Sequence, residues 1–425
     1  MPVPVVLRSL RHRNYLLFFS GNLISLIGTW MQSVAQSWLV YRLTGSSLLL
    51  GTVTFASQIP IFLFSPLGGA IADRHSRHRI VIATQAASMI LASILAALTF
   101  AHVIQEWHII VLAILLGVVN AFDVPARQAF LVEMVGKEDL TNAIALNSSM
   151  FNGARVIGPA IAGLLVAGIG EAWCFFANAV SYIAVIAGLL MMQLPPWSRN
   201  PPATSTFGHI AEGFRYVLNH APVRDILGLV GMISLAGMPY TVLMPVFADH
   251  ILHGGASAMG LLMGTSGVGA LAGALLLAAR TGLKGLGRWI AVGCVIFGVG
   301  LVAFGYSRVL YLSLALMLPV GCSMMVLMAS CNTLIQSMVS DHLRGRVMSV
   351  YSMMFMGMAP LGALAAGAFA NRLGAPFIVA AGGVVCIVTG GIFGYRLREF
   401  RPAARRMIQD QSALANAAEQ VVQHT

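Results

Sequence analysis

The sequence predicts an all-α integral membrane protein with twelve transmembrane helices arranged as two pseudo-symmetric six-helix bundles. Its 425 residues are 58% hydrophobic and only 9% charged, whereas a soluble domain carries about 25% charged residues. Twelve apolar stretches reach the length of about 20 residues that a helix needs to cross a bilayer. The second half repeats the first at a shift of 204 positions, so that Met134 and Gly158 align with Met338 and Gly362. These observations together indicate a membrane protein built from two parallel repeats.

The apolar stretches follow one another through short polar or charged connections, which places successive helices side by side and antiparallel. The predicted spans cover residues 15–41, 47–72, 80–103, 107–130, 141–168, 172–194, 224–249, 257–279, 288–307, 309–335, 345–371 and 374–396.

One connection is longer and divides the chain into two halves. It contains Pro195, Pro196, Pro201 and Pro202, which interrupt helices. Its second part, residues 207–218, places apolar side chains at helical spacing and predicts an amphipathic helix on the membrane surface. The predicted parts are an N-terminal bundle at 1–194, a linker at 195–223, a C-terminal bundle at 224–400 and a cytoplasmic tail at 401–425.

The distribution of basic residues predicts the orientation. With the N-terminus inside, 21 of the 25 Lys and Arg residues fall in inside segments, and only Arg42, Arg308 and Arg372 fall outside. Cytoplasmic segments carry such an excess, so both termini are predicted to be cytoplasmic, in a bacterial inner membrane. The net charge of +11 is therefore explained by topology and requires no nucleic-acid partner. The five cysteines lie in apolar segments without metal-ligand spacing, and we expect neither a metal nor a cofactor.

The connection between the second and third spans contains the strongest local motif. In it, Gly69 allows a neighbouring helix to approach closely, and Asp73 can cap a nearby helix N-terminus, with a basic cluster of Arg74, Arg77 and Arg79 after it. A simpler interpretation is that these are only inside positive charges.

This motif resembles the signature loop of the major facilitator superfamily, with Ser76 in place of the usual second glycine. The resemblance implies the twelve-helix fold of secondary transporters and assigns Gly69, Asp73, Arg74, Arg77 and Arg79 to a conformational latch. It also implies that Asp73 caps the span that starts near 345. The second half lacks the acid of this motif, because Leu277 aligns with Asp73.

Two ionisable residues, Asp123 and Arg155, lie clearly within spans, where charged groups are functional candidates by default. Asp123 has three alternative roles: a pair with Arg155, a cytoplasmic gate pair with Arg77 or Arg127, or proton carriage. Arg127 is one helical turn away. A static structural pair is the simplest alternative to a moving gate, and a paired carboxylate is a poor proton carrier unless the pair breaks during the cycle.

The segment around Asp123 and Arg127, with the later Gly158, Pro159 and Gly163, resembles a branch of the superfamily. That branch includes the third drug:proton antiporter group and the enterobactin exporter. The resemblance implies export, and Gly158, Pro159 and Gly163 are predicted to kink and pack their helix. The sequence departs from many proton-coupled drug exporters, since Ala113 stands where they carry an arginine four residues before a glycine.

Polar side chains follow one face of the first span and predict a surface that faces protein or water. In the superfamily, spans 1, 4, 7 and 10 line the central pathway. Interhelical hydrogen bonding without a ligand is the alternative explanation of the polar face. The predicted pathway residues are Asn22, Ser25, Thr29, Gln32, Ser33, Gln36, Asn120, Ser234, Met238, Thr241, Met324 and Met328.

The pathway is mostly uncharged and rich in methionine, which favours amphipathic organic substrates. We therefore expect a monomeric transporter that exports drug-like compounds or a secreted metabolite by alternating access, coupled to protons. A dedicated siderophore exporter and an uptake transporter for a small organic solute are the alternatives. The sequence contains no His-Glu-x-x-His or Gly-x-Ser-x-Gly motif and no ATP-binding loop, so neither an intramembrane enzyme nor direct ATP coupling is expected.

Overall fold

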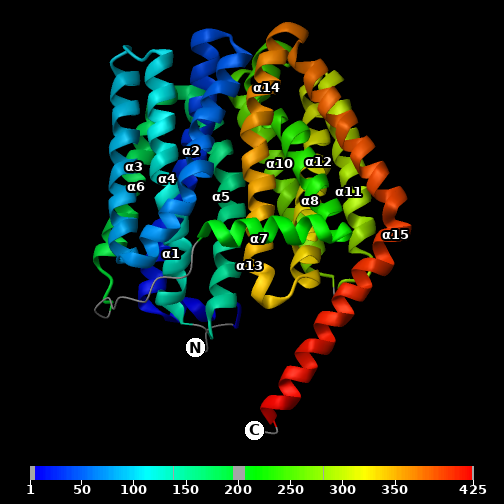
Figure 1. The fold of residues 1–425 in the computed structure, drawn as a ribbon. Coiled ribbons are helices and arrows are strands. Elements are labelled where there is room, and N and C mark those ends of the chain that lie inside the picture. Colours follow the sequence, from blue (N-terminus) through cyan, green and yellow to red (C-terminus); the bar gives the residue numbers. More distant parts are fainter. Residues whose placement is uncertain (1–4, 137, 195–205, 281, 424–425) are drawn as a thin grey trace.

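The first half of the chain folds into six long helices. The computed structural model describes residues 5–136, 138–194, 206–280 and 282–423, and places both ends of this range at the same end of the molecule (Figure 1). After a short 3₁₀ segment, η1 (Val5–Arg11), come α1 (Arg13–Thr44), α2 (Ser47–Arg74), α3 (Arg77–Phe100), α4 (Glu106–Val135), α5 (Leu140–Ile169) and α6 (Glu171–Leu190).

Local sequence sets where these helices end. Gly45 ends α1 in the left-handed conformation, with φ +61°, and its N–H donates to the Tyr41 carbonyl. The hydroxyl of Ser46 then accepts a hydrogen bond from the Leu49 N–H and starts α2. The predicted linker helix is α7 (Thr206–Asn219), although the side chains of 206–211 and the prolines at 195–202 lie outside the described residues.

The first predicted span of the second half is present, but it is not one regular helix. Residues 221–251 form α8 (Ala221–Met232), a π-helical turn η2 (Ile233–Gly237), a 3₁₀ turn η3 (Met238–Thr241), α9 (Met244–Val246) and a second π-helical turn η4 (Phe247–Ile251). Pro239 and Pro245 lie in this stretch. Because proline has no backbone N–H and clashes with the preceding turn, it disrupts a regular helix.

The remaining elements follow the predicted order. They are α10 (Gly255–Ala278), α11 (Leu286–Tyr306), α12 (Leu310–Met338), α13 (Asp341–Ser352), the π-helical turn η5 (Met353–Gly357), α14 (Met358–Leu373) and α15 (Ala375–Gln423). The last helix continues well beyond the predicted end of the span at 396, through Pro402, and projects from the bundle in Figure 1.

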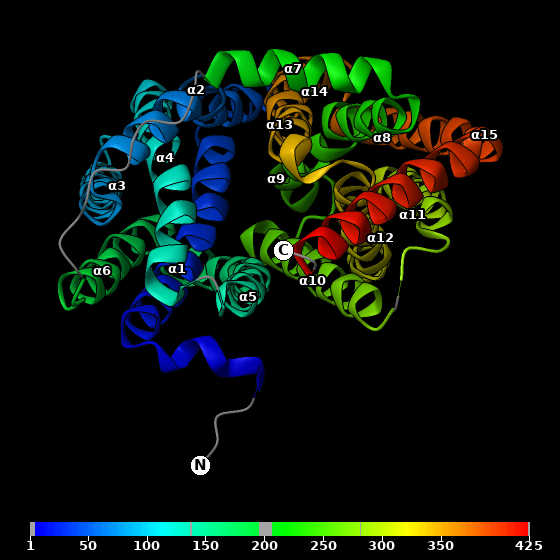
Figure 2. The same cartoon turned by 60° about the horizontal axis from the view of Figure 1, so that its bottom comes forward.

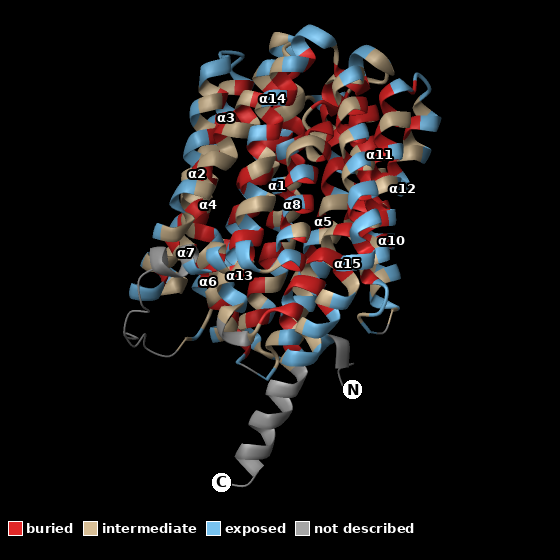
Figure 3. Ribbon diagram, turned by 45° about the vertical axis from the view of Figure 1, so that its right-hand side comes forward, coloured by how far each residue is buried: buried red, intermediate tan, exposed pale blue. Residues whose placement is uncertain are grey.

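Within the described part of the chain, eleven helical segments are long and apolar enough to cross a membrane. They include every predicted span except the first. Helix α1 has 32 residues and is long enough, but its polar side chains lower its apolar content. Large apolar side chains such as Leu164, Ile183 and Leu275 are exposed, and exposed positions are spread along the length of the helices (Figure 3). An apolar exterior of this kind is suited to lipid, and the all-α membrane fold is confirmed.

The two halves occupy two sides of the molecule, with α1–α6 on one side and α8–α15 on the other (Figure 2). The internal repeat appears in their packing. Helix α2 contacts α14 across the two bundles, and α10, which is the repeat equivalent of α2, contacts α5, the equivalent of α14. The bundles are therefore joined by two related helix pairs.

Glycines show where the bundles meet. A Cβ built at Gly51 would lie 2.4 Å from the Ala363 carbonyl oxygen, and one built at Gly163 would lie 2.9 Å from the Gly260 Cα. We call these contacts, together with Gly367 against Gly51, the glycine seam. The seam lies in the halves of these helices remote from the termini. Nearer the termini, Gly69 has no neighbouring atom within 4 Å of such a Cβ. The bundles are thus in contact at the remote end, and Gly69 near the terminal end takes part in no such close contact.

Helix α7 is attached to the second bundle. The carboxylate of Glu212 forms an ion pair with Arg346 of α13. A Cβ at Gly213 would lie 2.7 Å from the Arg346 carbonyl oxygen, so the two helices are in direct backbone contact. Among the described residues of the predicted amphipathic helix, Val217 is buried and therefore packs on protein, while Leu218 stays exposed.

Candidate functional site

Asp123 lies at the centre of a buried polar network in the first bundle. The residue is only 4% exposed. Its Oδ1 accepts hydrogen bonds from the Thr84 hydroxyl at 2.6 Å and from the Gln85 amide at 2.9 Å, both on α3. Its Oδ2 accepts from Arg127, whose Nε lies at 2.9 Å and whose Nη2 also donates. The carboxylate is therefore saturated with donors, as a buried charge requires.

Arg127 extends this network to a third helix. Its Nη1 donates to the Asn22 side-chain oxygen of α1 at 2.5 Å, and the Asn22 amide in turn points at the Met150 sulfur, 3.9 Å away. We call Asn22, Thr84, Gln85, Asp123 and Arg127 the Asp123 network. Pro125 lies between the two charged residues, but α4 is continuous, so the pair keeps its one-turn spacing. The network joins α1, α3 and α4.

Arg155 is not part of this network, so the predicted alternative of an Asp123–Arg155 pair is wrong for this structure. Arg127 is on the same helix as Asp123, one turn away, and forms the ion pair with its carboxylate. The guanidinium of Arg155 instead lies 5.9 Å from the centre of the Trp30 ring of α1. The gate pair with Arg127 is present as a contact, whereas proton carriage stays a prediction.

Among the described residues, no ion pair or hydrogen bond joins the predicted latch residues to the second bundle. Arg77 lies 2.7 Å from Glu133 of α4 and 3.6 Å from Asp73, while Arg74 and Arg79 are exposed. Within the same part of the chain, no ion pair or hydrogen bond links Asp73 to α13. Glu133 was not predicted as a member of this group. A charged residue at the end of a membrane helix is common and gave no distinctive signal.

Gly69 does not provide the close helix approach that was predicted. A Cβ there would meet nothing within 4 Å, whereas one at the adjacent Gly68 would lie 2.1 Å from the Ala121 carbonyl oxygen. The close contact between α2 and α4 therefore uses Gly68. Successive residues on a helix point about 100° apart, so a shift of one position changes the face.

The polar face of α1 separates into two parts. Asn22, Ser25 and Gln32 are buried, and Gln32 accepts a hydrogen bond from the Asn178 amide of α6 at 2.7 Å. Thr29 is exposed and donates to the Ser25 carbonyl, and Gln36 is partly exposed. The buried residues hold the bundle together, as the alternative of interhelical hydrogen bonding predicted. Thr29, Ser33 and Gln36 remain available to a ligand.

The predicted pathway residues of the other spans are also divided. Ser234 and Met324 are buried, and the Ser234 hydroxyl has no hydrogen-bond partner among the described residues. Asn120, Met238, Thr241 and Met328 are partly exposed.

The structure adds a polar pocket of about 490 Å³ that was not predicted. Its polar side chains recur at helical spacing in the last turns of α12, and this spacing in the sequence could have indicated a polar helix face. It is lined by Ala329, Asn332, Thr333, Gln336, Ser337 and Arg344.

Gly158, Pro159 and Gly163 pack α5 against two neighbours. A Cβ at Gly158 would lie 2.5 Å from the Trp30 Cβ of α1, and Gly163 belongs to the glycine seam with Gly260. The backbone of α5 remains one helix through Pro159. The helix thus connects the first bundle's interior to the second bundle.

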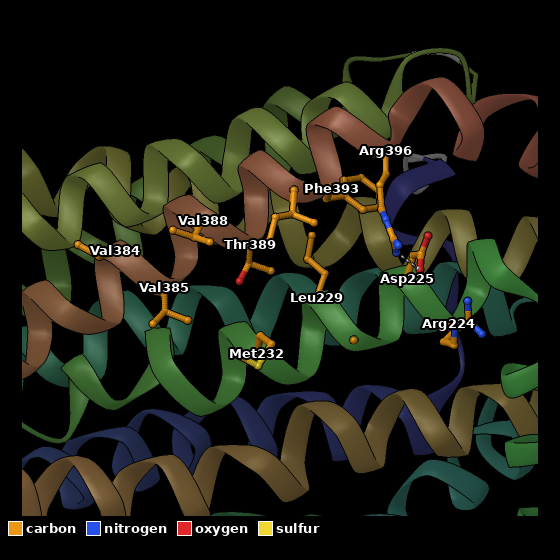
Figure 4. A pocket seen from close by; sticks show the side chains of 12 residues that line it. Arg224, Asp225, Leu229, Met232, Val384, Val385, Val388, Thr389, Phe393 and Arg396 are labelled. Carbon is orange, nitrogen blue, oxygen red and sulfur yellow. Dashed lines mark hydrogen bonds and ion pairs between the residues drawn. The ribbon is translucent and has the colours of Figure 1, made fainter.

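A second groove of about 510 Å³ lies on the outer side of the second bundle, between α8 and α15 (Figure 4). Its walls are mainly aliphatic, and at one end Arg396 pairs with Asp225 at 3.4 Å. Both of its helices belong to one bundle, so this groove is separate from the space between the bundles.

Two repeated helical bundles, a glycine seam at one end and a buried charge network in the interior define a membrane transporter of the major facilitator type rather than an enzyme. Residues 6–424 match the transmembrane secretion effector family. The chain belongs to this family of the major facilitator superfamily.

Several characterised proteins resemble the chain over most of its length. It is 29% identical to the staphyloferrin A transporter of Staphylococcus aureus, over 82% of this chain and 87% of that protein. It is 26% identical to the multidrug efflux pump Tap of Mycolicibacterium fortuitum, over 89% and 95%. It is 23% identical to the macrolide efflux protein A of Streptococcus pyogenes, over 87% and 93%.

Solved structures support the fold alone. A peptide transporter crystallised with sulfate superimposes with a TM-score of 0.72 at 11% identity, covering 92% of this chain and 95% of that one. A bacterial homologue of ferroportin, solved in an inward-facing state, has a TM-score of 0.67 at 19% identity, covering 90% and 98%.

Proposed function

We propose that this protein exports amphipathic organic compounds across the bacterial inner membrane by alternating access, driven by the proton gradient. The observation that carries the proposal is the Asp123 network, a buried carboxylate that joins three helices of one bundle. The efflux proteins among the relatives favour export over uptake. The excess of basic residues on the terminal side favours cytoplasmic termini.

This orientation would place the glycine seam on the periplasmic side and the latch residues on the cytoplasmic side. Among the described residues, no ion pair or hydrogen bond joins the latch residues to the second bundle, which is consistent with an inward-open state. In the opposite state, Asp73 would approach the N-terminus of α13 and the cytoplasmic ends would close. The charge distribution of the latch suits this contact, because a carboxylate is favourable at a helix N-terminus.

The Asp123 network supplies a route to coupling. When Asp123 takes up a proton, its interaction with Arg127 weakens, and Arg127 and Asn22 lose their fixed geometry. Since Asn22 is on α1 and Thr84 and Gln85 are on α3, protonation loosens the packing between these helices and α4. A change in helix packing within one bundle then biases the equilibrium between the two states.

The test is intracellular accumulation of fluorescent drugs in an efflux-deficient bacterial host, with and without a protonophore. Cells express the wild-type protein, Asp123→Asn or the matched control Asp225→Asn, which changes a carboxylate outside the pathway. We expect the wild type and Asp225→Asn to lower accumulation in a protonophore-sensitive manner and Asp123→Asn to lose this effect at normal protein levels. Accumulation equal to that of empty vector for every drug would contradict drug export.

A second candidate is a dedicated exporter of one secreted metabolite such as a siderophore. The similarity to the staphyloferrin A transporter favours it. The two candidates differ in range, since a dedicated exporter would lower the accumulation of none of the drugs but would release its own metabolite into the medium. Mass spectrometry of the medium from the source organism, with the gene intact and deleted, distinguishes them.

A further inference from the structure

Arg155 lies at the midpoint of α5, on the face directed into the protein. The exposed, lipid-compatible face of this helix carries Ile157, Ile161 and Leu164. At 100° per residue, Arg155 lies about half a turn from that face. The Arg155 backbone oxygen lies 3.2 Å from a Cβ built at Gly267 of α10, which places this turn next to the second bundle. The side chain is partly exposed, so a ligand between the bundles can reach it.

No carboxylate neutralises this guanidinium among the described residues. The one acidic residue in the middle of a span, Asp123, is held by Arg127. Glu171, at the start of α6, lies 2.8 Å from Arg42. A lone cation in the interior of a membrane protein is unfavourable and marks a functional site. The positive charge of Arg155 is therefore available to pair with a negatively charged group of a ligand.

Aromatic rings lie beside this charge. The Trp30 ring is 5.9 Å from the guanidinium carbon, near the outer limit of a cation–π contact. Trp30 in turn makes an edge-to-face contact with Phe151, with ring centres 5.5 Å apart. Phe151 is exposed. A flat apolar surface next to a guanidinium fits a ligand that joins an aromatic body to an acidic group.

We propose that Arg155, Trp30 and Phe151 form the binding site for the carboxylate end of an aromatic, singly charged substrate. The proposal rests on the proposed transport function and specifies the class of substrate. One guanidinium neutralises one negative charge, which fits a monoanion better than a phosphate or a polycarboxylate. The repeat does not duplicate the site, because Ala359 and Ser234 align with Arg155 and Trp30. The site is thus confined to the first bundle.

Equilibrium dialysis of the purified full-length protein tests this proposal with two isosteric radiolabelled probes. One is 2-naphthoate, a monoanion, and the other is 2-naphthylmethylammonium, a monocation. The variants are Arg155→Gln, Arg155→Lys and the control Arg372→Gln, which alters an exposed arginine at the remote end of α14. We expect the wild type to prefer the anion. Arg155→Gln should weaken naphthoate binding by about tenfold or more, as expected for the loss of a charge-assisted contact, and should leave the cation unaffected. Arg155→Lys should recover part of the loss.

Three results would overturn the assignment: no detectable naphthoate binding by the wild type, an unchanged affinity in Arg155→Gln, or equal weakening for both probes. Equal weakening would show that the arginine only connects α1 to α5 through Trp30. Because the measurement requires no transport, naphthoate binding that depends on Arg155 in a protein without efflux activity would contradict the proposed export function and leave the binding site standing.

Discussion

The two bundles share one helix order but keep different interiors. The first bundle buries a charged network, whereas the second has fully buried apolar or thiol side chains at three of the five equivalent positions, and exposed Arg288 and partly exposed Trp289 align with Thr84 and Gln85. The three pairs with a buried counterpart are Asn22 with Ile226, Asp123 with Leu327 and Arg127 with Cys331.

The backbone is more regular in the first bundle than in the second. The membrane helices of the first bundle are continuous, even at Pro66 and Pro159, while the second bundle contains π-helical turns at Ile233–Gly237, Phe247–Ile251 and Met353–Gly357. Such turns often mark functional sites in helices. The comparison assigns charge chemistry to the first bundle and conformational adjustment to the second.

The largest effect should follow from replacing one residue of the Asp123–Arg127 pair by its aligned counterpart in the second bundle. Asp123→Leu leaves the Arg127 charge without its carboxylate, and we expect the free energy of unfolding to fall by about 3–5 kcal/mol. Thermal unfolding in detergent measures this loss.

The double variant Asp123→Leu with Arg127→Cys copies both residues of the second bundle. Because an apolar pair often replaces a buried ion pair without loss of stability, we expect stability near that of the wild type but no proton-dependent transport. A double variant as unstable as the single one would show that Thr84, Gln85 and Asn22 need the charges to pack.

A second prediction concerns the two ends of the molecule. Gly163→Leu would force side-chain atoms against Gly260, where a Cβ already lies at 2.9 Å from its Cα, and so should open the remote end. Gly69→Leu has free space here but would block closure of the terminal end. We expect opposite shifts in the population of the present state, by about tenfold each, or 1.4 kcal/mol.

Spin-label distances across the bundles at each end measure these populations. Shifts in the same direction would rule out Gly69 as a residue that packs only in the opposite state.

A third prediction concerns the irregular backbone of the second bundle. Pro360 follows the π-helical turn Met353–Gly357 and lacks an N–H for the preceding turn. Pro360→Ala should allow a more regular helix and slow turnover by about threefold, a barrier change of roughly 0.7 kcal/mol. Pro66→Ala, within a continuous helix of the first bundle, is the matched control. If Pro360→Ala and Pro66→Ala slow transport equally, the π-helical turn of the second bundle has no special role in turnover.

The smallest effect should come from the ion pair at the end of the α8–α15 groove. The Arg396 side chain is 55% exposed and lies 3.4 Å from Asp225. Exposed pairs contribute about 0–1 kcal/mol, so Arg396→Gln should change the thermal unfolding midpoint very little and leave efflux intact. A large loss of efflux would show that this groove takes part in transport.

The sequence predicted the helices well because lipid imposes a strict length and polarity on each span. The predicted span 47–72, for example, corresponds to α2 (Ser47–Arg74). The predicted span 224–249 corresponds to the membrane-length segment Ala221–Ile251, but its π-helical and 3₁₀ turns were not predicted, although Pro239 and Pro245 were visible. Hydropathy measures apolar content, and a broken helix contains as much of it as a regular one.

The candidate site was predictable only in part. Asp123 and Arg127 stand four residues apart, so their contact follows from helix geometry. Thr84 and Gln85 lie 39 and 38 positions from Asp123, and their role depends on how α3 is rotated against α4. Two adjacent polar residues inside a span were a usable signal. To predict that Asp123 pairs with Arg127 and not with Arg155 requires the distances between helices, which sequence periodicity does not provide.

The glycine seam has a thermodynamic consequence. Two helices that meet through glycines have few apolar side chains to expose when they separate, and hydrophobic free energy scales with the apolar area exposed. The seam itself therefore contributes little hydrophobic free energy against separation. A ligand with a differential affinity of about 5.5 kcal/mol reverses a 1:99 population, and a smaller preference suffices when the states start closer. The small side chains at this contact make its opening responsive to a ligand that binds only weakly.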